Sequence, residues 1–307
     1  MSHLLTLWDL TPQQTREILD LAIELKSGVQ QGKRPSLLEN QVLVQIYEKP
    51  SLRTRVSFEA AIGQLGGTGM FMTEKEAGLH GRETMEDIAR VAGRMADFIV
   101  LRTFSQKTIE VFAQYAQGHV VNGLSDDFHP CQALTDVLTI EELFGSCEGR
   151  KVVYLGDSNN VTRSLAIACA QLKMPFVACS PEDYQLDREF IDQLKSTYPG
   201  CEVTQSSEPQ TAVADADVLY TDVWASMGQE EEAESRKKIF ADYQINEELL
   251  ACAPKHAKLL HCLPAKRDQE VTDAVVEGPQ SAMFDQAENR LHIAKAVFVW
   301  LSRQTDR

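Results

Sequence analysis

The chain has 307 residues, with 30 lysines and arginines against 45 aspartates and glutamates, so its formal net charge is −15. Hydrophobic residues make up 43% and charged residues 24%, a balance that supports folded cores and excludes bulk disorder. An acidic chain of this kind argues against nonspecific binding to nucleic acids or anionic membranes, because like charges repel. At about 150 residues per domain, the length predicts two domains.

The sequence favours a cytoplasmic location. No apolar run reaches the ~18 residues that a membrane-spanning helix needs. The N-terminal segment MSHLLTLWDLTPQQ lacks a basic leader and a small-residue cleavage site. The seven cysteines are scattered, odd in number and without a C-x-x-C pair. This pattern favours reduced thiols over a disulfide framework or a structural zinc site, and we expect no metal and no membrane or nucleic-acid partner.

The first half of the chain alternates predicted helices and strands. Thr11 and Gln14 form a capping box around Pro12, which predicts a helix start, and Ser27-Gly28 is its expected end. Apolar runs predict strands at Gln41–Tyr47, Phe98–Leu101 and His119–Asn122, and helical spacing predicts helices over Ser51–Leu65 and after Pro130. A glycine-bounded break from Gly145 to Gly149 marks the expected junction between the domains.

The second half repeats this alternation. Strands are predicted at Lys151–Leu155, Phe176–Cys179, Val218–Tyr220 and Lys258–His261, with helices from about Val161, from near Pro181 and over Asn289–Ser302. Strands that alternate with helices predict an α/β fold with a mainly parallel sheet, flanked by helices, in each domain. Ligands of such sheets bind beyond the carboxyl ends of the strands, so polar segments at those ends are the candidate sites.

Two of these polar segments lie in the first domain. Ser51-Leu52-Arg53-Thr54-Arg55 opens a helix, where free N–H groups, hydroxyls and guanidiniums favour phosphate binding over a merely capped surface helix. His129-Pro130-Cys131-Gln132 precedes the next helix, and His129 and Gln132 are potential donors to a carbonyl oxygen. Arg102, at the end of a strand, adds charge to the same rim. The alternatives are a structural turn at His129 and an exposed Arg102.

The other segments lie in the second domain. Asp222–Gly228 offers a carboxylate, a hydroxyl and a glycine to a zwitterionic ligand, or forms a turn capped by Asp222. In His261-Cys262-Leu263-Pro264, a nucleophilic cysteine would need a positioned base, but strand alternation predicts that His261 points away, so a structural Cys262 is favoured. Gly156–Asn160 sits at a dinucleotide-binding position without the G-x-G-x-x-G glycines, which weakens a nicotinamide oxidoreductase interpretation.

Taken in order, six segments resemble the aspartate/ornithine carbamoyltransferase family over nearly the whole chain. They are SLRTRVSFE from Ser51, FHPCQALTD from Phe128, GDSNNV from Gly156, DVWASMGQEEE from Asp222, HCLPAKR from His261 and FDQAENRLH from Phe284. The S-x-R-T-R and H-P-x-Q elements are typical of the whole family. The D-x-x-x-S-M-G and H-C-L-P elements are similar to its ornithine branch.

The resemblance implies a fold and an activity. It implies two α/β domains joined by two helices: a carbamoyl phosphate domain at 1–145, completed by the C-terminal helix 288–307, and an ornithine domain at 146–287. It implies homotrimers, or multiples of trimers, with active sites at subunit interfaces and no cofactor. The activity implied is transfer of the carbamoyl group from carbamoyl phosphate to the δ-amine of L-ornithine, which gives L-citrulline and phosphate.

The resemblance also assigns residues. Carbamoyl phosphate would be bound by Ser51, Leu52, Arg53, Thr54, Arg102, His129, Gln132, Cys262, Leu263 and Arg290, of which Arg102, His129, Cys262 and Arg290 are the catalytic candidates. Ornithine would be bound by Asn160, Asp222, Ser226 and Met227. The amine would attack the carbonyl carbon, and Arg102 and His129 would stabilise the oxyanion that forms.

Three positions depart from the family pattern, and two other interpretations stay open. Leu52 replaces a common threonine, Gly78 replaces a glutamine of a loop that reaches the neighbouring subunit, and Arg163 replaces Asn or His. His80 or Arg82 would have to substitute for the loop contact, and Arg163 either meets the ornithine carboxylate or faces solvent. The alternatives are another acceptor (N-acetyl- or N-succinylornithine, putrescine or aspartate) and a non-catalytic carbamoyl phosphate-binding protein.

Overall fold

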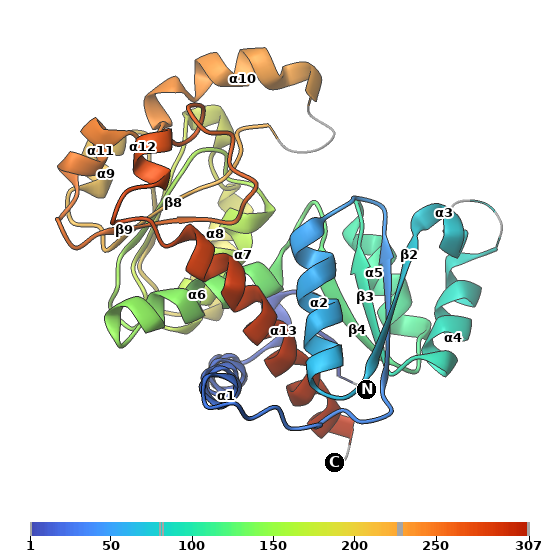
Figure 1. Ribbon diagram of the computed structural model, residues 1–307. Coiled ribbons are helices and arrows are strands. Elements are labelled where there is room, and N and C mark those ends of the chain that lie inside the picture. The colour runs from blue at the N-terminus through green and yellow to red at the C-terminus, as the bar shows by residue number, and fades with distance from the viewer. Residues whose placement is uncertain (1, 80, 82, 226–229, 306–307) are drawn as a thin grey trace. The chain divides into compact units, whose positions relative to one another are not determined.

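The computed structural model describes residues 2–79, 81, 83–225 and 230–305. The chain divides into two compact units, one comprising residues 1–138 with 288–307 and the other comprising residues 139–287. The chain passes from one unit to the other twice, each time inside a helix. These helices are α6 (Pro130–Phe144) and α13 (Met283–Thr305), and each contributes residues to both units (Figure 1). Each unit holds one parallel sheet with helices against it, and the predicted α/β fold is confirmed.

Unit 1 has a four-stranded sheet in the order β2-β1-β3-β4. Its strands are β1 (Val42–Tyr47), β2 (Thr68–Thr73), β3 (Phe98–Arg102) and β4 (His119–Leu124). Its other helices are η1 (Leu7–Asp9), α1 (Pro12–Gln30), α2 (Leu52–Gln64), α3 (Glu74–Ala77), α4 (Met85–Met95) and α5 (Gln106–Tyr115). The strand order reverses between β1 and β3, which is where ligands of open α/β sheets usually bind.

The two faces of this sheet are covered by different helices. On one face, Phe98 of β3 packs its ring 4.7 Å from that of Phe298 on α13, which in turn lies 5.5 Å from Phe58 on α2. On the other face, Ile99 and its neighbours form a buried cluster with residues of α4 and α5. Because successive side chains of a strand alternate between the two faces of the sheet, the apolar run of β3 places buried side chains on both faces.

Unit 2 has a five-stranded sheet in the order β7-β6-β5-β8-β9. Its strands are β5 (Val152–Leu155), β6 (Phe176–Cys179), β7 (Val203–Ser206), β8 (Val218–Thr221) and β9 (Lys258–His261). Its helices are α7 (Asn160–Gln171), η2 (Glu182–Tyr184), α8 (Arg188–Thr197), α9 (Pro209–Val213), η3 (Glu230–Glu232), α10 (Ala233–Ile239), η4 (Ala241–Tyr243), α11 (Glu247–Cys252) and α12 (Asp273–Val276). Here the order reverses between β5 and β8.

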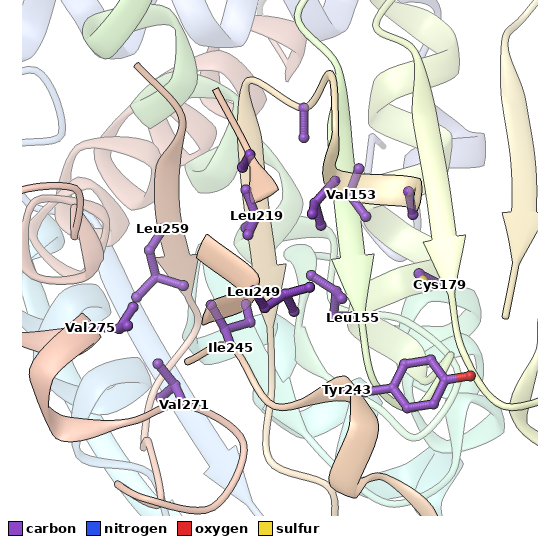
Figure 2. Packing of buried hydrophobic residues seen from close by; sticks show 14 of the residues in the cluster. Val153, Leu155, Cys179, Leu219, Tyr243, Ile245, Leu249, Leu259, Val271 and Val275 are labelled. Atoms are coloured by element: carbon purple, nitrogen blue, oxygen red, sulfur yellow. The ribbon is translucent and has the colours of Figure 1, made fainter. Parts of the chain in front are cut away.

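The core of unit 2 fills one face of its sheet. Figure 2 shows strand residues with apolar residues from the connecting segments around them: Val153, Leu155, Leu219 and Leu259, with Ile245, Leu249, Val271 and Val275. On these strands, Tyr154 and Tyr220 alternate with the core residues, and their rings stack with centroids 5.5 Å apart. The strands therefore bury both faces, as their apolar sequences predict.

The predicted elements are present, with differences at several boundaries. Helix α1 continues past Ser27-Gly28 to Gln30, because Gly28 keeps the helix and the left-handed turn comes at Gly32, whose φ is 76°. Near Pro181 only the short η2 forms, and α8 begins at Arg188. Strands β2 and β7 lie at sheet edges and were not predicted, because each is only partly buried and lacks a strong apolar pattern. None of the described helices combines the length and apolarity required to cross a bilayer.

The packing of α4 gives a matched pair of glycine substitutions. A Cβ on Gly93 would lie 2.5 Å from the backbone nitrogen of Gln117, whereas a Cβ on Gly63 of α2 would meet nothing within 4 Å. We expect Gly93→Ala to destabilise the protein by about 1–3 kcal/mol through overpacking. Gly63→Ala should stabilise it by about 0.5–1 kcal/mol, because alanine favours helix. Urea unfolding checks both signs, and equal shifts would contradict this packing.

Candidate active site

Helix α2 begins at the carboxyl end of β1, at the reversal point of the unit 1 sheet. Ser51 is its N-cap: the Ser51 hydroxyl oxygen accepts the Thr54 N–H at 3.2 Å and the hydroxyl donates to Thr54 Oγ1 at 3.0 Å. Leu52 is 75% exposed and its side chain has no hydrogen-bonding group, so only its backbone N–H can contribute to a polar site at this helix start. The first N–H groups of a helix and the positive end of its dipole form a site suited to an anion.

Two arginines converge on the Thr54 hydroxyl. Arg102 follows a register shift at the end of β3 and donates from Nη1 to Thr54 Oγ1 at 3.4 Å. Arg290, on α13, donates from Nη2 to the same oxygen at 3.0 Å. All three residues are buried. Two guanidiniums removed from water are costly unless they are well bonded, and a bound anion would offset that cost.

His129 and Gln132, at the start of α6, hold the other side of the Arg290 guanidinium. Nη1 of Arg290 bonds to Gln132 Oε1 and lies 3.3 Å from His129 Nε2. The Gln132 amide nitrogen donates to Asp136 Oδ1 at 2.8 Å, which fixes the orientation of the amide. The sequence suggested both side chains as donors to a carbonyl oxygen. The structure differs, because both present acceptor atoms to Arg290, and arginine itself offers only donors.

His129 is therefore a neutral imidazole. Its bond to Arg290 requires Nε2 to carry no proton, which assigns the ring proton to Nδ1. Burial lowers the pKa of His129 well below its usual value, and the Arg290 and Arg102 guanidiniums lower the pKa further. A protonated ring would add a third cation to the cluster, so the same charges that suit an anion keep His129 uncharged.

The reversal point of the unit 2 sheet carries a carboxylate. Asp222 follows β8 and is buried, and its Oδ1 accepts the Val223 N–H at 2.8 Å. Asn159 follows β5, caps α7 and donates from Nδ2 to Asp222 Oδ2 at 3.0 Å. Asn160 is the first residue of α7, and its Oδ1 accepts the Val161 N–H at 3.0 Å. Ser226 and Met227, the other predicted ornithine ligands, lie outside the described residues.

Arg236 of α10 ties the segment after Asp222 to the rest of unit 2. Its guanidinium donates to the Trp224 carbonyl and forms an ion pair with Asp157, and it lies 5.0 Å from the centroid of the Tyr184 ring. The Arg236 side chain is 4% exposed. Burial raises the pKa of Asp157, while Arg236 opposes that rise. Sequence reasoning missed Arg236, because it sits among exposed charged residues of α10 and only its tertiary contacts distinguish it.

His261 and Glu270 form a fully buried pair. His261 Nδ1 accepts the Leu263 N–H at 2.8 Å, which leaves the proton on Nε2, and Nε2 lies 3.1 Å from Glu270 Oε1. Ligand atoms of His261, Cys262 and Asp222 lie within 4.8 Å of one another. The prediction that His261 points away from Cys262 is therefore wrong: β9 ends at His261 and the chain turns, so strand alternation no longer applies.

These three residues carry ligand types that zinc accepts. Within the described ranges they are the one such group of three. However, both His261 nitrogens are already bonded, so a metal would have to displace either the Leu263 N–H or Glu270. Glu270 has no sequence signal of its own, and only the fold brings it beneath His261. Leu263 packs against the core of unit 2.

The structure also places the other two departures from the family pattern, Arg163 and Gly78. Arg163 on α7 pairs with Asp187 at 2.5 Å and lies 5.8 Å from the centroid of the Phe190 ring, so its cation is engaged on the α7–α8 surface. Gly78 ends α3 in a left-handed conformation with φ 74°. His80 and Arg82, which would substitute for the missing glutamine, lie outside the described residues.

The chain is similar over nearly its whole length to proteins of one family. Residues 2–142 match the family described as aspartate/ornithine carbamoyltransferase, carbamoyl-P binding domain, and residues 148–301 match the corresponding Asp/Orn binding domain. The ornithine carbamoyltransferase of Wolinella succinogenes is 44% identical over 99% of both chains. That of Thermococcus kodakarensis is 48% identical over 95% of this chain and 94% of its own. The ornithine carbamoyltransferase structure from Pyrococcus furiosus has a TM-score of 0.93 at 46% identity, over 97% of this chain and 96% of that one.

The neutral state of His129 predicts a pH dependence of stability. Its folded pKa lies below the ~6.5 of an unfolded histidine, so the unfolded chain binds the extra proton, and stability is lost as pH falls through 6.5. His129→Gln should therefore lose less stability than the wild type between pH 7 and 5.5, by about 1 kcal/mol in urea unfolding. His256→Gln, which changes a ring that is 59% exposed, is the control. An identical pH slope in wild type and His129→Gln would refute the assignment.

Proposed function

This chain belongs to the aspartate/ornithine carbamoyltransferase family, and from that premise we propose how its residues divide the reaction. The enzyme transfers the carbamoyl group of carbamoyl phosphate to the δ-amine of L-ornithine, giving L-citrulline and phosphate. In the proposal, residues 1–145 with helix 288–307 bind carbamoyl phosphate, and residues 146–287 bind ornithine. The cluster around Thr54 holds the anion, and the Asp222 carboxylate meets the amino acid.

The observation that carries the proposal is the convergence of two buried guanidiniums on Thr54 at a helix N-terminus. A phosphate bound there would accept hydrogen bonds from Ser51, Thr54, the backbone of Leu52 and the Arg53 and Arg102 side chains. Its negative charge would offset the two buried cations, and charge-assisted bonds of this type are the strongest that a protein offers. Gln132 contributes indirectly, because its Oε1 fixes Arg290.

The chemistry follows from these charges. The neutral δ-amine attacks the carbonyl carbon, a C–N bond forms, and the carbonyl electrons move onto oxygen. The oxyanion collapses, the C–O bond to phosphate breaks, and the proton of the former amine passes to the departing phosphate, which leaves as hydrogen phosphate. Arg102, together with Arg290 and its partner His129, stabilises the oxyanion electrostatically. Cys262 and Leu263 close around the carbamoyl group. These steps need neither a cofactor nor a covalent enzyme intermediate, because phosphate is already a good leaving group and the rest is positioning.

Asp222 selects the acceptor. Its carboxylate binds the α-ammonium of ornithine, while Asn160, Ser226 and Met227 bind the ornithine carboxylate. N-acetylornithine and N-succinylornithine have no free α-amine for Asp222, and putrescine has no carboxylate for the other three residues. Aspartate would bring a second carboxylate, and the buried Asp222 carboxylate would repel it. Ornithine is the acceptor that matches both ends of the site.

The assembly and the location are proposed on separate observations. Leu52 and Val56 lie one turn apart on α2, beside the cluster around Thr54, and are 75% and 53% exposed. We propose that a neighbouring subunit covers this apolar strip in a homotrimer, because exposed apolar patches beside a site commonly mark interfaces. All seven cysteines are free thiols, which supports a reducing, cytoplasmic location.

The acceptor assignment is tested with four amines. Purified protein is mixed with carbamoyl phosphate and, separately, with ornithine, N-acetylornithine, putrescine and aspartate, and carbamoylated product is measured together with released phosphate. We expect citrulline from ornithine and no product from the other three, because only ornithine offers both an α-ammonium and one α-carboxylate beside its reactive amine. Turnover of a different amine would mean that Asp222 has another partner. Tight binding of carbamoyl phosphate without any turnover would support a non-catalytic protein.

The phosphate site is tested at Thr54. Thr54→Val keeps the shape of the side chain but removes the oxygen that both guanidiniums share. We expect the KM for carbamoyl phosphate to rise about tenfold or more at saturating ornithine, the size expected for loss of a hydrogen bond to a charged group. Thr15→Val, at a buried threonine on α1 outside this cluster, is the matched control. An unchanged KM in Thr54→Val would place the phosphate elsewhere.

A further inference from the structure

We infer that Asn159 is a positioning residue that holds the Asp222 carboxylate in the orientation that ornithine requires. The inference rests on the proposed function, in which Asp222 binds the α-ammonium. It adds a residue to the ornithine site that the sequence pattern did not select, since the pattern pointed to the next residue, Asn160. Its basis is that the two ends of the Asn159 side-chain amide form hydrogen bonds with two different parts of unit 2.

The carbonyl end of the Asn159 amide is committed to helix α7. Oδ1 accepts the N–H of Val161 at 2.9 Å and the N–H of Thr162 at 3.3 Å, and the Tyr154 hydroxyl lies 3.4 Å away. These are the N–H groups that a helix start leaves without an intrahelical partner. Because backbone N–H groups only donate, the atom that faces them must be the oxygen, which fixes the orientation of the amide.

The nitrogen end of the amide consequently faces Asp222. Nδ2 donates to Asp222 Oδ2 at 3.0 Å, while Asp222 Oδ1 accepts the Val223 N–H at 2.8 Å. With one N–H on each oxygen, the plane of the carboxylate is set before any ligand arrives. A carboxylate offers about four lone-pair positions, so acceptor capacity remains for an ammonium group.

This bond crosses the reversal point of the unit 2 sheet. Asn159 follows β5 and Asp222 follows β8, and these strands are direct neighbours, with Leu155 paired to Thr221 at their carboxyl ends. The amide therefore joins the two loops between which an open α/β sheet usually binds its ligand. This bond therefore fixes the position of the Asp222 carboxylate, which binds ornithine in the proposed function, relative to the start of α7.

Capping alone does not explain an asparagine at position 159. Asn, Asp and Ser cap helices almost equally well. An aspartate here would place a second carboxylate against Asp222, in a region that already holds Asp157. A serine would cap, but its shorter side chain would not also reach Asp222. Of the three good caps, only asparagine supplies both an acceptor for the helix and a neutral donor for the carboxylate.

The test separates the cap from the donor. Asn159→Ser and Asn159→Asp both retain a capping oxygen and lose the donor, and Asn246→Ser is the matched control, because Asn246 caps α11 through the Leu249 N–H at 2.9 Å. The readouts are the KM values for both substrates, the melting temperature, and the Kd of L-norvaline (ornithine without its δ-amine) at saturating carbamoyl phosphate. Norvaline reports binding of the amino-acid end independently of the chemical step.

For Asn159→Ser we expect about a tenfold rise in the ornithine KM and the norvaline Kd, the size expected for one hydrogen bond to a charged group. Asn159→Asp should weaken both further, because it adds repulsion. The KM for carbamoyl phosphate and the melting temperature should stay near wild type, and Asn246→Ser should change neither kinetic constant. If Asn159→Ser fails to fold, Asn159→Asp, whose charge favours the helix start, carries the same test.

Asp222→Asn separates this inference from the function on which it rests. If Asp222→Asn weakens norvaline and ornithine binding but both Asn159 variants bind normally, Asn159 does not position Asp222 and the inference fails alone. If Asp222→Asn leaves both affinities unchanged, the ornithine site itself is wrongly assigned. If the Asn159 variants raise the KM of both substrates equally and lower the melting temperature, Asn159 is only a cap, and the inference is overturned.

Discussion

Two buried guanidiniums that share one threonine hydroxyl are the constraint on which unit 1 depends. Bringing Arg102 and Arg290 together out of water requires partners for their donors, and Thr54, Gln132 and His129 supply them. Thr54 comes from the start of α2, and His129 and Gln132 come from the start of α6, so these two helix starts and the end of β3 must meet at one point of α13. The neutral His129 follows from the same charges. A phosphate bound there completes an arrangement of cations that is otherwise expensive to bury.

Unit 2 also places its candidate site where the strand order reverses, but with the opposite charge. In both sheets two candidate site residues lie at the carboxyl ends of the strands that flank the reversal of strand order: Ser51 and Arg102 at the ends of β1 and β3, and Asn159 and Asp222 at the ends of β5 and β8. The first pair of strands presents cations and a helix N-terminus, and the second presents the Asp222 carboxylate with α7 already capped by Asn159. The helix start that would otherwise attract an anion is satisfied by the Asn159 oxygen. In the proposed binding mode, the Asp222 carboxylate is thus left to the ligand ammonium.

Much of this could be predicted from the sequence, because it depends on local signals. Thr11 and Ser51 cap their helices through bonds to residues three positions on, and the strands Phe176–Cys179 and Lys258–His261 coincide with apolar runs. What could not be predicted depends on contacts between distant segments. The sequence gives no sign that Arg163 pairs with Asp187, that Gln132 accepts from Arg290, or that Glu270 lies beneath His261. Edge strands β2 and β7 were missed because a half-buried strand has no strong apolar pattern.

The same cations resolve a conflict in the proposed reaction. A net charge of −15 repels carbamoyl phosphate and attracts ornithine, but at physiological salt such fields are screened beyond about 8 Å. In the proposed binding mode, the buried guanidiniums dominate at shorter range and hold the phosphate. Ornithine must then bring its δ-amine to the carbamoyl carbon as a free base, although a free amine of this type has a pKa near 10.4. A neighbouring guanidinium disfavours the ammonium form. The charges that bind one substrate therefore also favour the reactive form of the other, so the reaction needs no separate base beside the δ-amine.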